Sequence, residues 1–123
     1  MHIKESAENY LESILMLREK NGTARSIDVA RDLQFSKASV SVAMKNLRQD
    51  GYITVDGDGE IYLTNKGKKV AESMYERHKL IAGALIALGV SEETAYADSC
   101  KIEHDISDET FECLKKYITE HLG

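Results

Sequence analysis

The 123-residue sequence has no proline, no low-complexity tract and no long apolar run. Without proline-rich or repetitive stretches, a disordered region or a flexible linker is not expected. The longest apolar stretch, residues 80–90, is about half of the roughly 20 residues that a membrane helix needs. The first six residues also lack the apolar core of a secretory signal. These absences predict a folded protein with no membrane partner.

Cysteine is scarce: only Cys100 and Cys113 are present. Two cysteines are too few for a disulfide framework or a structural zinc knuckle, so a reducing, cytoplasmic setting is the simplest expectation. Cys113 is expected to pack in the core.

Basic side chains are also in the minority, and the net charge is −5. Their distribution is uneven, because residues 23–69 carry eight Lys/Arg against six Asp/Glu, whereas residues 70–123 carry five against eleven. This asymmetry is compatible with an N-terminal part that binds DNA and a C-terminal part that has a different role.

Helical periodicity predicts a mostly α fold, interrupted once by a hairpin. Helices are expected over 5–20, 27–33 and 37–50. Two short runs rich in β-forming residues then flank "DGDG", a strong hairpin signal. Helices over 65–88, 92–105 and 108–122 complete the chain. This order predicts a winged helix-turn-helix DNA-binding domain over 1–64 and an all-helical metal-binding and dimerisation domain over 65–123.

The first domain shows clear helix boundaries. Ser26 is predicted to cap the second helix, which should bury Ile27, and Ser36 to cap the third. Gly51 stands where a helix commonly ends.

The third helix has an exposed side with the chemistry of a DNA-binding surface. Small residues let a helix approach the groove closely, and lysines and hydroxyls can donate to phosphates. The alternative is that this side of the helix is only exposed to solvent and binds nothing. The predicted DNA-binding set is Arg25, Ser26, Ser36, Lys37, Ser39, Ser41, Val42 and Lys45.

The stretch "SCKIEHDIS" places Cys100, Glu103 and His104 at positions i, i+3 and i+4, on one face of a helix. A thiolate, a carboxylate and an imidazole at this spacing could ligate a transition metal. The alternative is a core cysteine beside a solvated Glu–His pair. These three residues alone favour the second interpretation.

The winged helix, "ERHKL" in the linking helix and "CKIEH" in the next one together resemble the iron- and manganese-dependent repressors of the diphtheria toxin repressor type. The resemblance extends from "AENYLESILML" to "SDETFECL". It implies a short form without the SH3-like third domain, and a two-lobed protomer that dimerises through its C-terminal helices. It also implies that Fe(II) or Mn(II) binds between the lobes. The loaded dimer would then repress metal-uptake genes at palindromic operators in double-stranded DNA.

The resemblance also implies a ligand set, with Co(II), Ni(II) or Zn(II) as substitutes in vitro. Ala82 and Tyr96 replace ancillary ligands of iron-type members, and the amide of Asn9 is a weaker ligand than a carboxylate. The implied metal ligands are Asn9, Glu12, His78, Cys100, Glu103 and His104.

Two other classes of function compete with this interpretation. A winged-helix regulator that is not controlled by metal would leave the Cys–Glu–His group empty. A metalloenzyme would need a substrate cleft and a general base, and the sequence shows no phosphate loop or nucleophile motif. The sequence therefore predicts a non-enzymatic regulator.

Overall fold

The computed structural model describes residues 5–121, which fall into two compact units that divide between Glu72 and Ser73. The boundary between the units falls inside the fourth helix. The elements, in chain order, are α1 (Glu5–Asn21), α2 (Ser26–Leu33), α3 (Lys37–Gln49), β1 (Ile53–Val55), β2 (Ile61–Leu63), α4 (Asn65–Ala87), α5 (Glu92–Asp105) and α6 (Asp108–His121). The predicted mostly α class is confirmed.

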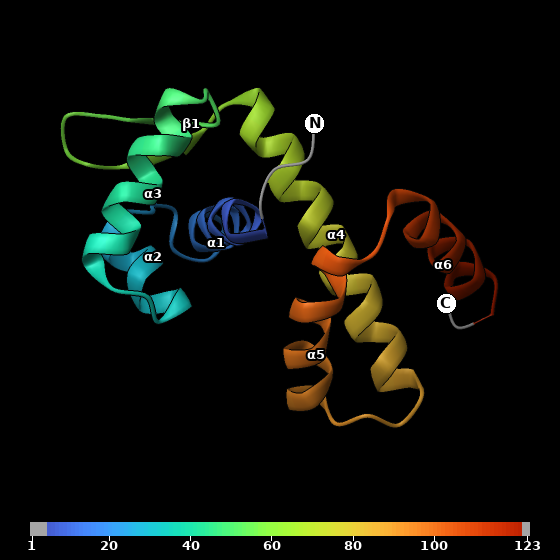
Figure 1. Cartoon of the computed structure of the whole chain (residues 1–123). Helices are drawn as coiled ribbons and strands as arrows, with labels where there is room; N and C mark the ends of the chain where they lie inside the picture. The colour runs from blue at the N-terminus through green and yellow to red at the C-terminus, as the bar shows by residue number, and fades with distance from the viewer. Residues whose placement is uncertain (1–4, 122–123) are drawn as a thin grey trace. The chain divides into compact units, whose positions relative to one another are not determined.

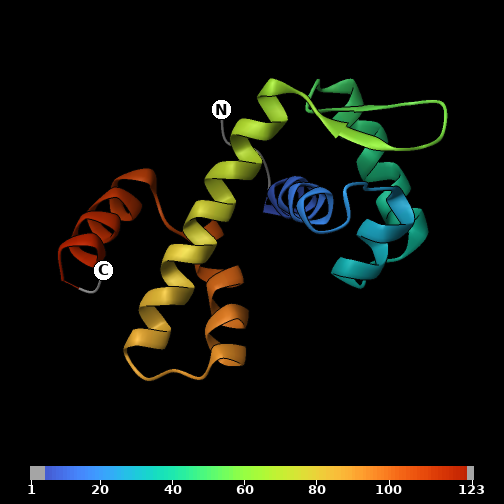
Figure 2. The same ribbon diagram turned by 180° about the vertical axis from the view of Figure 1, so that it is seen from behind.

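The first unit is the predicted winged helix-turn-helix. Helices α1, α2 and α3 precede a two-stranded antiparallel hairpin, the wing, in which Ile53 pairs with Leu63 and Val55 with Ile61 (Figures 1 and 2). The first and third residues of each strand face the core, because side chains alternate between the two faces of a strand: Ile53 and Ile61 are buried, and Val55 and Leu63 are partly buried against the same core. The fully buried residues of this core include Leu11, Ile14, Val29, Val40 and Ile61.

The start of α2 differs from the prediction. Arg25, not Ser26, is the N-cap residue, and its backbone N–H donates to the Asp28 carboxylate at 3.0 Å. Ile27 was predicted to be buried, but it is 46% exposed, and Val29 and Ala30 face the core instead. An eight-residue helix has about two turns. Successive residues of a helix are about 100° apart, so Val29 lies on nearly the opposite side from Ile27, and the face that buries Val29 leaves Ile27 exposed.

Other boundaries agree with the prediction. The Ser36 hydroxyl accepts a hydrogen bond from the backbone N–H of Ser39 at the start of α3. Gly51 follows the end of α3 with φ +83°, a conformation that L side chains rarely adopt.

The second unit contains most of α4 and all of α5 and α6. The α5 helix runs back beside the C-terminal half of α4 (Figures 1 and 2). Ser91 caps α5, and Ser107 accepts from the N–H of Thr110 at the start of α6. Phe111 of α6 is buried, but Cys113 is exposed, so the predicted core position of Cys113 is wrong. Within residues 5–121, no helix is long and apolar enough to cross a membrane.

Candidate metal centre and DNA-binding surface

The contact between α4 and α5 brings together three side chains that can ligate a metal. His78 lies on α4, and Cys100 and Glu103 lie one turn apart on α5. One ligand atom of each lies within 4.8 Å of the other two. All three residues belong to the second unit, so this cluster does not depend on how the two units are placed.

The cluster centres on the Nδ1 atom of His78. This nitrogen is 3.0 Å from Oε2 of Glu103 and 3.7 Å from Sγ of Cys100. Hydrogen bonding to Cys100, and then to Glu103, raises the pKa of His78 to about 10, although burial acts in the opposite direction. The hydrogen-bond acceptors around His78 therefore favour the protonated, positively charged imidazole over the neutral ring.

Glu103 supports the interpretation as a cation site. Its side chain is fully buried, and its Oε1 accepts no hydrogen bond from the described residues. The imidazole Nε2 of His104 lies 3.4 Å from that oxygen. A buried carboxylate oxygen without a hydrogen bond is unfavourable, and a bound cation would remove that cost. The residues present therefore fit a divalent transition metal.

Three neighbours of the cluster had no predicted role. The fully buried Ser99 donates its hydroxyl proton to the His78 carbonyl at 2.8 Å, and its oxygen is 3.2 Å from Nδ1. The Tyr96 ring stacks on the imidazole with centroids 5.6 Å apart. Arg77 is buried next to His78 in sequence. Spacing could have indicated the first two, since Tyr96, Ser99, Cys100 and Glu103 follow the i, i+3, i+4, i+7 pattern of one helix face.

The remaining predicted ligands lie elsewhere in the chain or at the edge of the cluster. Asn9 and Glu12 are one turn apart on α1, in the first unit. Their contribution to metal binding stays a prediction. The imidazole of His104 lies beside Glu103, but His104 is not one of the three residues that group around His78. Its contribution to metal binding also stays a prediction.

The predicted DNA-binding side chains of α3 are on the surface. Lys37, Ser39, Ser41 and Lys45 are exposed, and Val42 is 61% exposed. DNA contact by these side chains stays a prediction. The opposite side of α3 packs inward through Val40, Met44 and Leu47.

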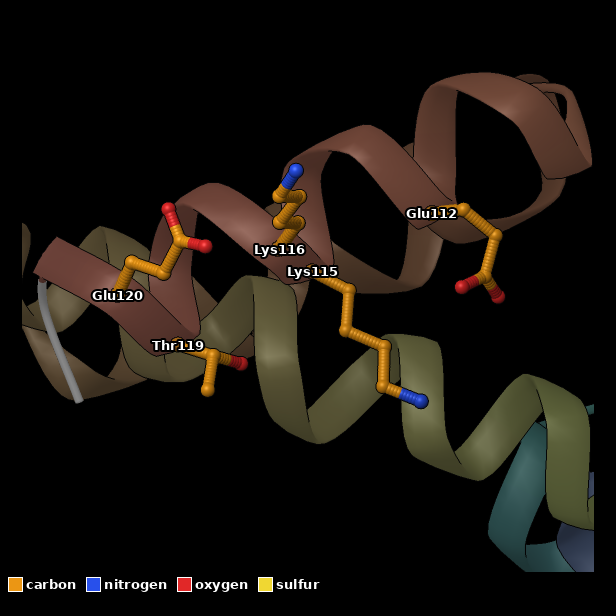
Figure 3. Close-up of a pocket in the computed structure, with 5 residues that line it drawn as sticks. All are labelled: Glu112, Lys115, Lys116, Thr119 and Glu120. Carbon is orange, nitrogen blue, oxygen red and sulfur yellow. The ribbon is translucent and has the colours of Figure 1, made fainter.

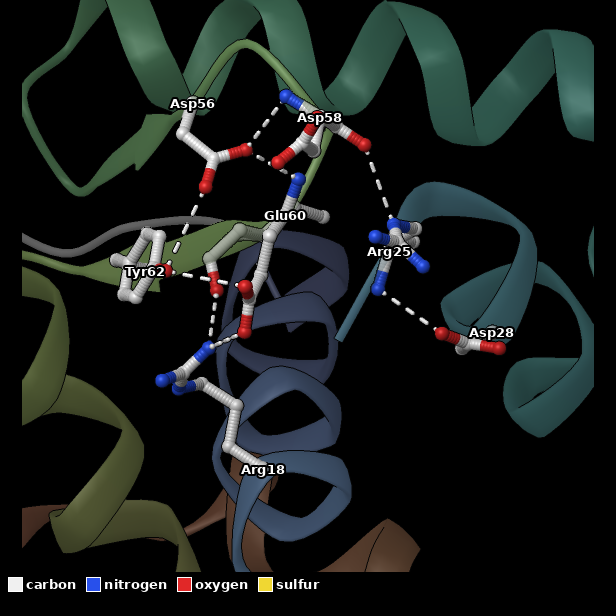
Figure 4. Close-up of polar contacts among 8 residues, drawn as sticks. Arg18, Arg25, Asp28, Asp56, Asp58, Glu60 and Tyr62 are labelled. Atoms are coloured by element: carbon white, nitrogen blue, oxygen red, sulfur yellow. Dashed lines mark hydrogen bonds and ion pairs between the residues drawn. The ribbon is translucent and has the colours of Figure 1, made fainter. Parts of the chain in front are cut away.

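Two arginines of the first unit bind the wing (Figure 4). Arg25 donates from Nε to the Asp58 carbonyl at 3.2 Å, and Arg18 pairs with Glu60 at 2.9 Å. Asp56 accepts from the backbone N–H groups of Asp58 and Glu60, both at 2.9 Å. The wing tip is thus ordered and acidic, which disfavours phosphate contacts there. DNA contact by Arg25 stays a prediction.

Comparison with known proteins covers both units. Residues 2–61 match the family described as iron dependent repressor, N-terminal DNA binding domain. Residues 64–121 match the family described as iron dependent repressor, metal binding and dimerisation domain.

Individual relatives agree with these matches. The transcriptional regulator MntR of Escherichia coli O6:H1 is 33% identical over 120 residues, which are 98% of this chain and 77% of that protein. The HTH-type transcriptional regulator MntR of Bacillus subtilis is 38% identical over 102 residues, or 83% of this chain and 72% of that protein. The solved structure of the manganese regulator SloR superimposes with a TM-score of 0.80 at 28% identity, covering 97% of this chain and 55% of that one.

Proposed function

Because the chain belongs to the iron-dependent repressor family, we propose that His78, Cys100 and Glu103 hold its activating metal ion and that the loaded protein represses metal-uptake genes. The protein is a metal-dependent, DNA-binding transcriptional regulator and not an enzyme. The observation that carries the proposal is the convergence of thiol, imidazole and carboxyl on one point between α4 and α5.

The chemistry of the donors favours Fe(II) over Mn(II) as the activator. A bound cation here would join α4 to α5 and balance the negative charge of the thiolate and the carboxylate. Mn(II) is suited to oxygen ligands, whereas thiolate and imidazole raise affinity for Fe(II), Co(II), Ni(II) and Zn(II). The thiol of Cys100 therefore determines the order of metal affinities that we expect.

DNA binding is proposed to use the exposed face of α3, and the dimer to recognise a palindromic operator. A two-fold symmetric dimer presents two copies of α3, so half-sites should be spaced by whole turns of the duplex. A regulator of this kind acts in the compartment that holds the DNA, which is the cytoplasm of a bacterial or archaeal cell.

The alternative is a winged-helix regulator whose DNA binding ignores metal. The exposed α3 face alone is compatible with it. The buried Glu103 carboxylate favours metal control, because its Oε1 accepts no hydrogen bond from the described residues and a bound cation would offset the cost of burying that oxygen.

The test is DNA binding under defined metal. Fluorescence anisotropy with operator candidates from upstream of metal-uptake genes should show tight binding with Fe(II), Mn(II) or Co(II), under reducing, anaerobic conditions. A chelator should abolish it. His78→Gln should lose the metal response, while His121→Gln, which changes an exposed histidine of α6, should keep it. Equal binding in metal and in chelator would support the metal-independent alternative.

A further inference from the structure

Arg77 is a buried cation on α4 that the proposed metal site does not use. It directly precedes His78, and the residue is only 5% exposed. Burying a guanidinium group is costly unless it is paired and hydrogen-bonded. Its partners therefore indicate what the residue does.

The guanidinium binds the carboxyl end of α5. Its Nη1 donates to the carbonyl oxygens of Glu103, at 3.1 Å, and of Ile106, at 2.9 Å. Carbonyls in the last turn of a helix have no intrahelical donor, and that end of the helix carries partial negative charge. Arg77 thus satisfies two acceptors in the turn that carries Glu103.

The same group also reaches α6. Its Nη2 forms an ion pair with Asp108, and the guanidinium lies over the Phe111 ring, 5.0 Å from the centroid. The Asp108 side chain is 91% exposed, so solvent weakens that pair. The better shielded contacts are those to the backbone of α5.

We propose that Arg77 is a positioning residue of the metal centre: it holds the last turn of α5 so that the Glu103 carboxylate faces His78. The inference rests on the proposed function of this cluster. One ligand follows Arg77 directly on α4, and the other is the residue whose carbonyl Arg77 binds on α5. The arginine therefore fixes the separation of two ligands without touching the metal.

The test measures Co(II) affinity by competition with a chelator and records the ligand-field and thiolate charge-transfer bands. Arg77→Met should weaken Co(II) binding by about tenfold or more, the usual effect of losing a group that orients a ligand. The Co(II) affinity of Arg77→Lys should lie between those of the wild type and Arg77→Met, because an ammonium group lacks the planar fork of donors. Asp108→Asn should have a smaller effect than Arg77→Met, because it leaves the α5 carbonyl contacts in place.

A nearby ion pair offers a matched control. Lys115 of α6 extends toward α4 and pairs with Glu76 at 2.7 Å; it also lines a surface pocket with Glu112, Lys116, Thr119 and Glu120 (Figure 3). Lys115→Met removes an α4–α6 contact next to Arg77 without disturbing the α5 carbonyls. It should leave Co(II) affinity and the bands unchanged.

A double-mutant cycle separates positioning from general stabilisation. If Arg77 acts through Glu103, then Arg77→Met should cost less than about twofold in a Glu103→Gln background. Helix content by circular dichroism verifies folding, and Arg77→Lys replaces Arg77→Met in the cycle if the latter does not fold.

The outcomes distinguish the two proposals. Equal losses in both backgrounds, a loss in Asp108→Asn as large as that in Arg77→Met, or wild-type affinity in the Arg77 variants would each overturn the positioning role alone. Wild-type protein that binds no Co(II) would overturn the proposed function, and this inference with it.

Discussion

Cys100 is the residue on which the metal preference should depend. It supplies the soft ligand of the cluster, and its Sγ lies 3.7 Å from Nδ1 of His78. We expect wild-type protein to be activated at lower free Fe(II) or Co(II) than Mn(II), because ligand softness affects affinity directly. Cys100→Glu should reduce or reverse this difference between the free concentrations of the metals needed for activation.

The measurement is metal-dependent DNA binding at buffered free metal concentrations, together with the cobalt spectrum. A thiolate-to-cobalt charge-transfer band should appear in wild type and vanish in Cys100→Glu. Cys113→Ser serves as control, because that exposed cysteine of α6 lies outside the cluster. Activation of wild type at the lowest concentration by Mn(II), without the thiolate band, would contradict the role of Cys100.

Gly67 sets how closely the start of α4 approaches the backbone of Tyr52 within the first unit. A Cβ added there would lie 2.0 Å from the Tyr52 carbonyl oxygen, which is backbone and cannot move freely. Gly67→Ala should therefore lower the free energy of unfolding by roughly 2–3 kcal/mol, the upper part of the range for overpacking.

Urea unfolding measures this change, and Gly83→Ala in the same helix is the matched control. A Cβ at Gly83 meets nothing within 4 Å, so alanine should stabilise the protein by up to about 1 kcal/mol through helix propensity. Equal effects of the two substitutions would show that the approach to Tyr52 is not limiting.

At the scale of elements, α3 is the helix expected to enter the major groove. Its buried side is fixed by Val40, Met44 and Leu47, so the exposed lysines and serines are the ones available to DNA. Lys45→Ala should weaken binding to all DNA sequences alike and reduce the slope of log affinity against log salt by about one.

Anisotropy titrations at several salt concentrations measure this slope. The control is Lys20→Ala, which removes an exposed lysine from the last turn of α1. An unchanged slope for Lys45→Ala would remove this residue from the phosphate contacts, and a change for Lys20→Ala would extend the DNA surface to α1.

For the whole molecule, the family assignment includes dimerisation of residues 64–121. The second unit leaves large apolar side chains exposed on α6, among them Tyr117, which is 57% exposed, and Leu114, which is 37% exposed. Covering such side chains is favourable by about 25 cal/mol per Å² of apolar area. Tyr117→Glu combined with Leu114→Glu should therefore give monomers.

Sedimentation velocity at micromolar concentration tests this expectation. Met16→Glu, an equally polar change at an exposed apolar residue of α1, should remain dimeric. A dimeric double variant would place the interface elsewhere in the second unit, and a monomeric wild type would contradict two-fold operator recognition.

The sequence by itself determined the order and type of the elements, because periodicity, capping residues and the "DGDG" turn act over a few neighbours. It also determined the kinds of ligand, since Cys100 and Glu103 must share a face once α5 is helical. Recognition of "ERHKL" and "CKIEH" then indicated that His78 belongs with them.

Only the tertiary structure decided which groups meet. Ile27 is exposed because the packing of α2, not its period alone, selects the buried face. Arg77 binds the end of α5 because α4 and α5 lie side by side. Its two carbonyl partners are 26 and 29 positions further along the sequence. A local sequence pattern does not determine such long-range contacts, because the segment between two elements can bring them together in many ways. Tertiary packing therefore turned a list of ligand types into a cluster with His78 Nδ1 at its centre.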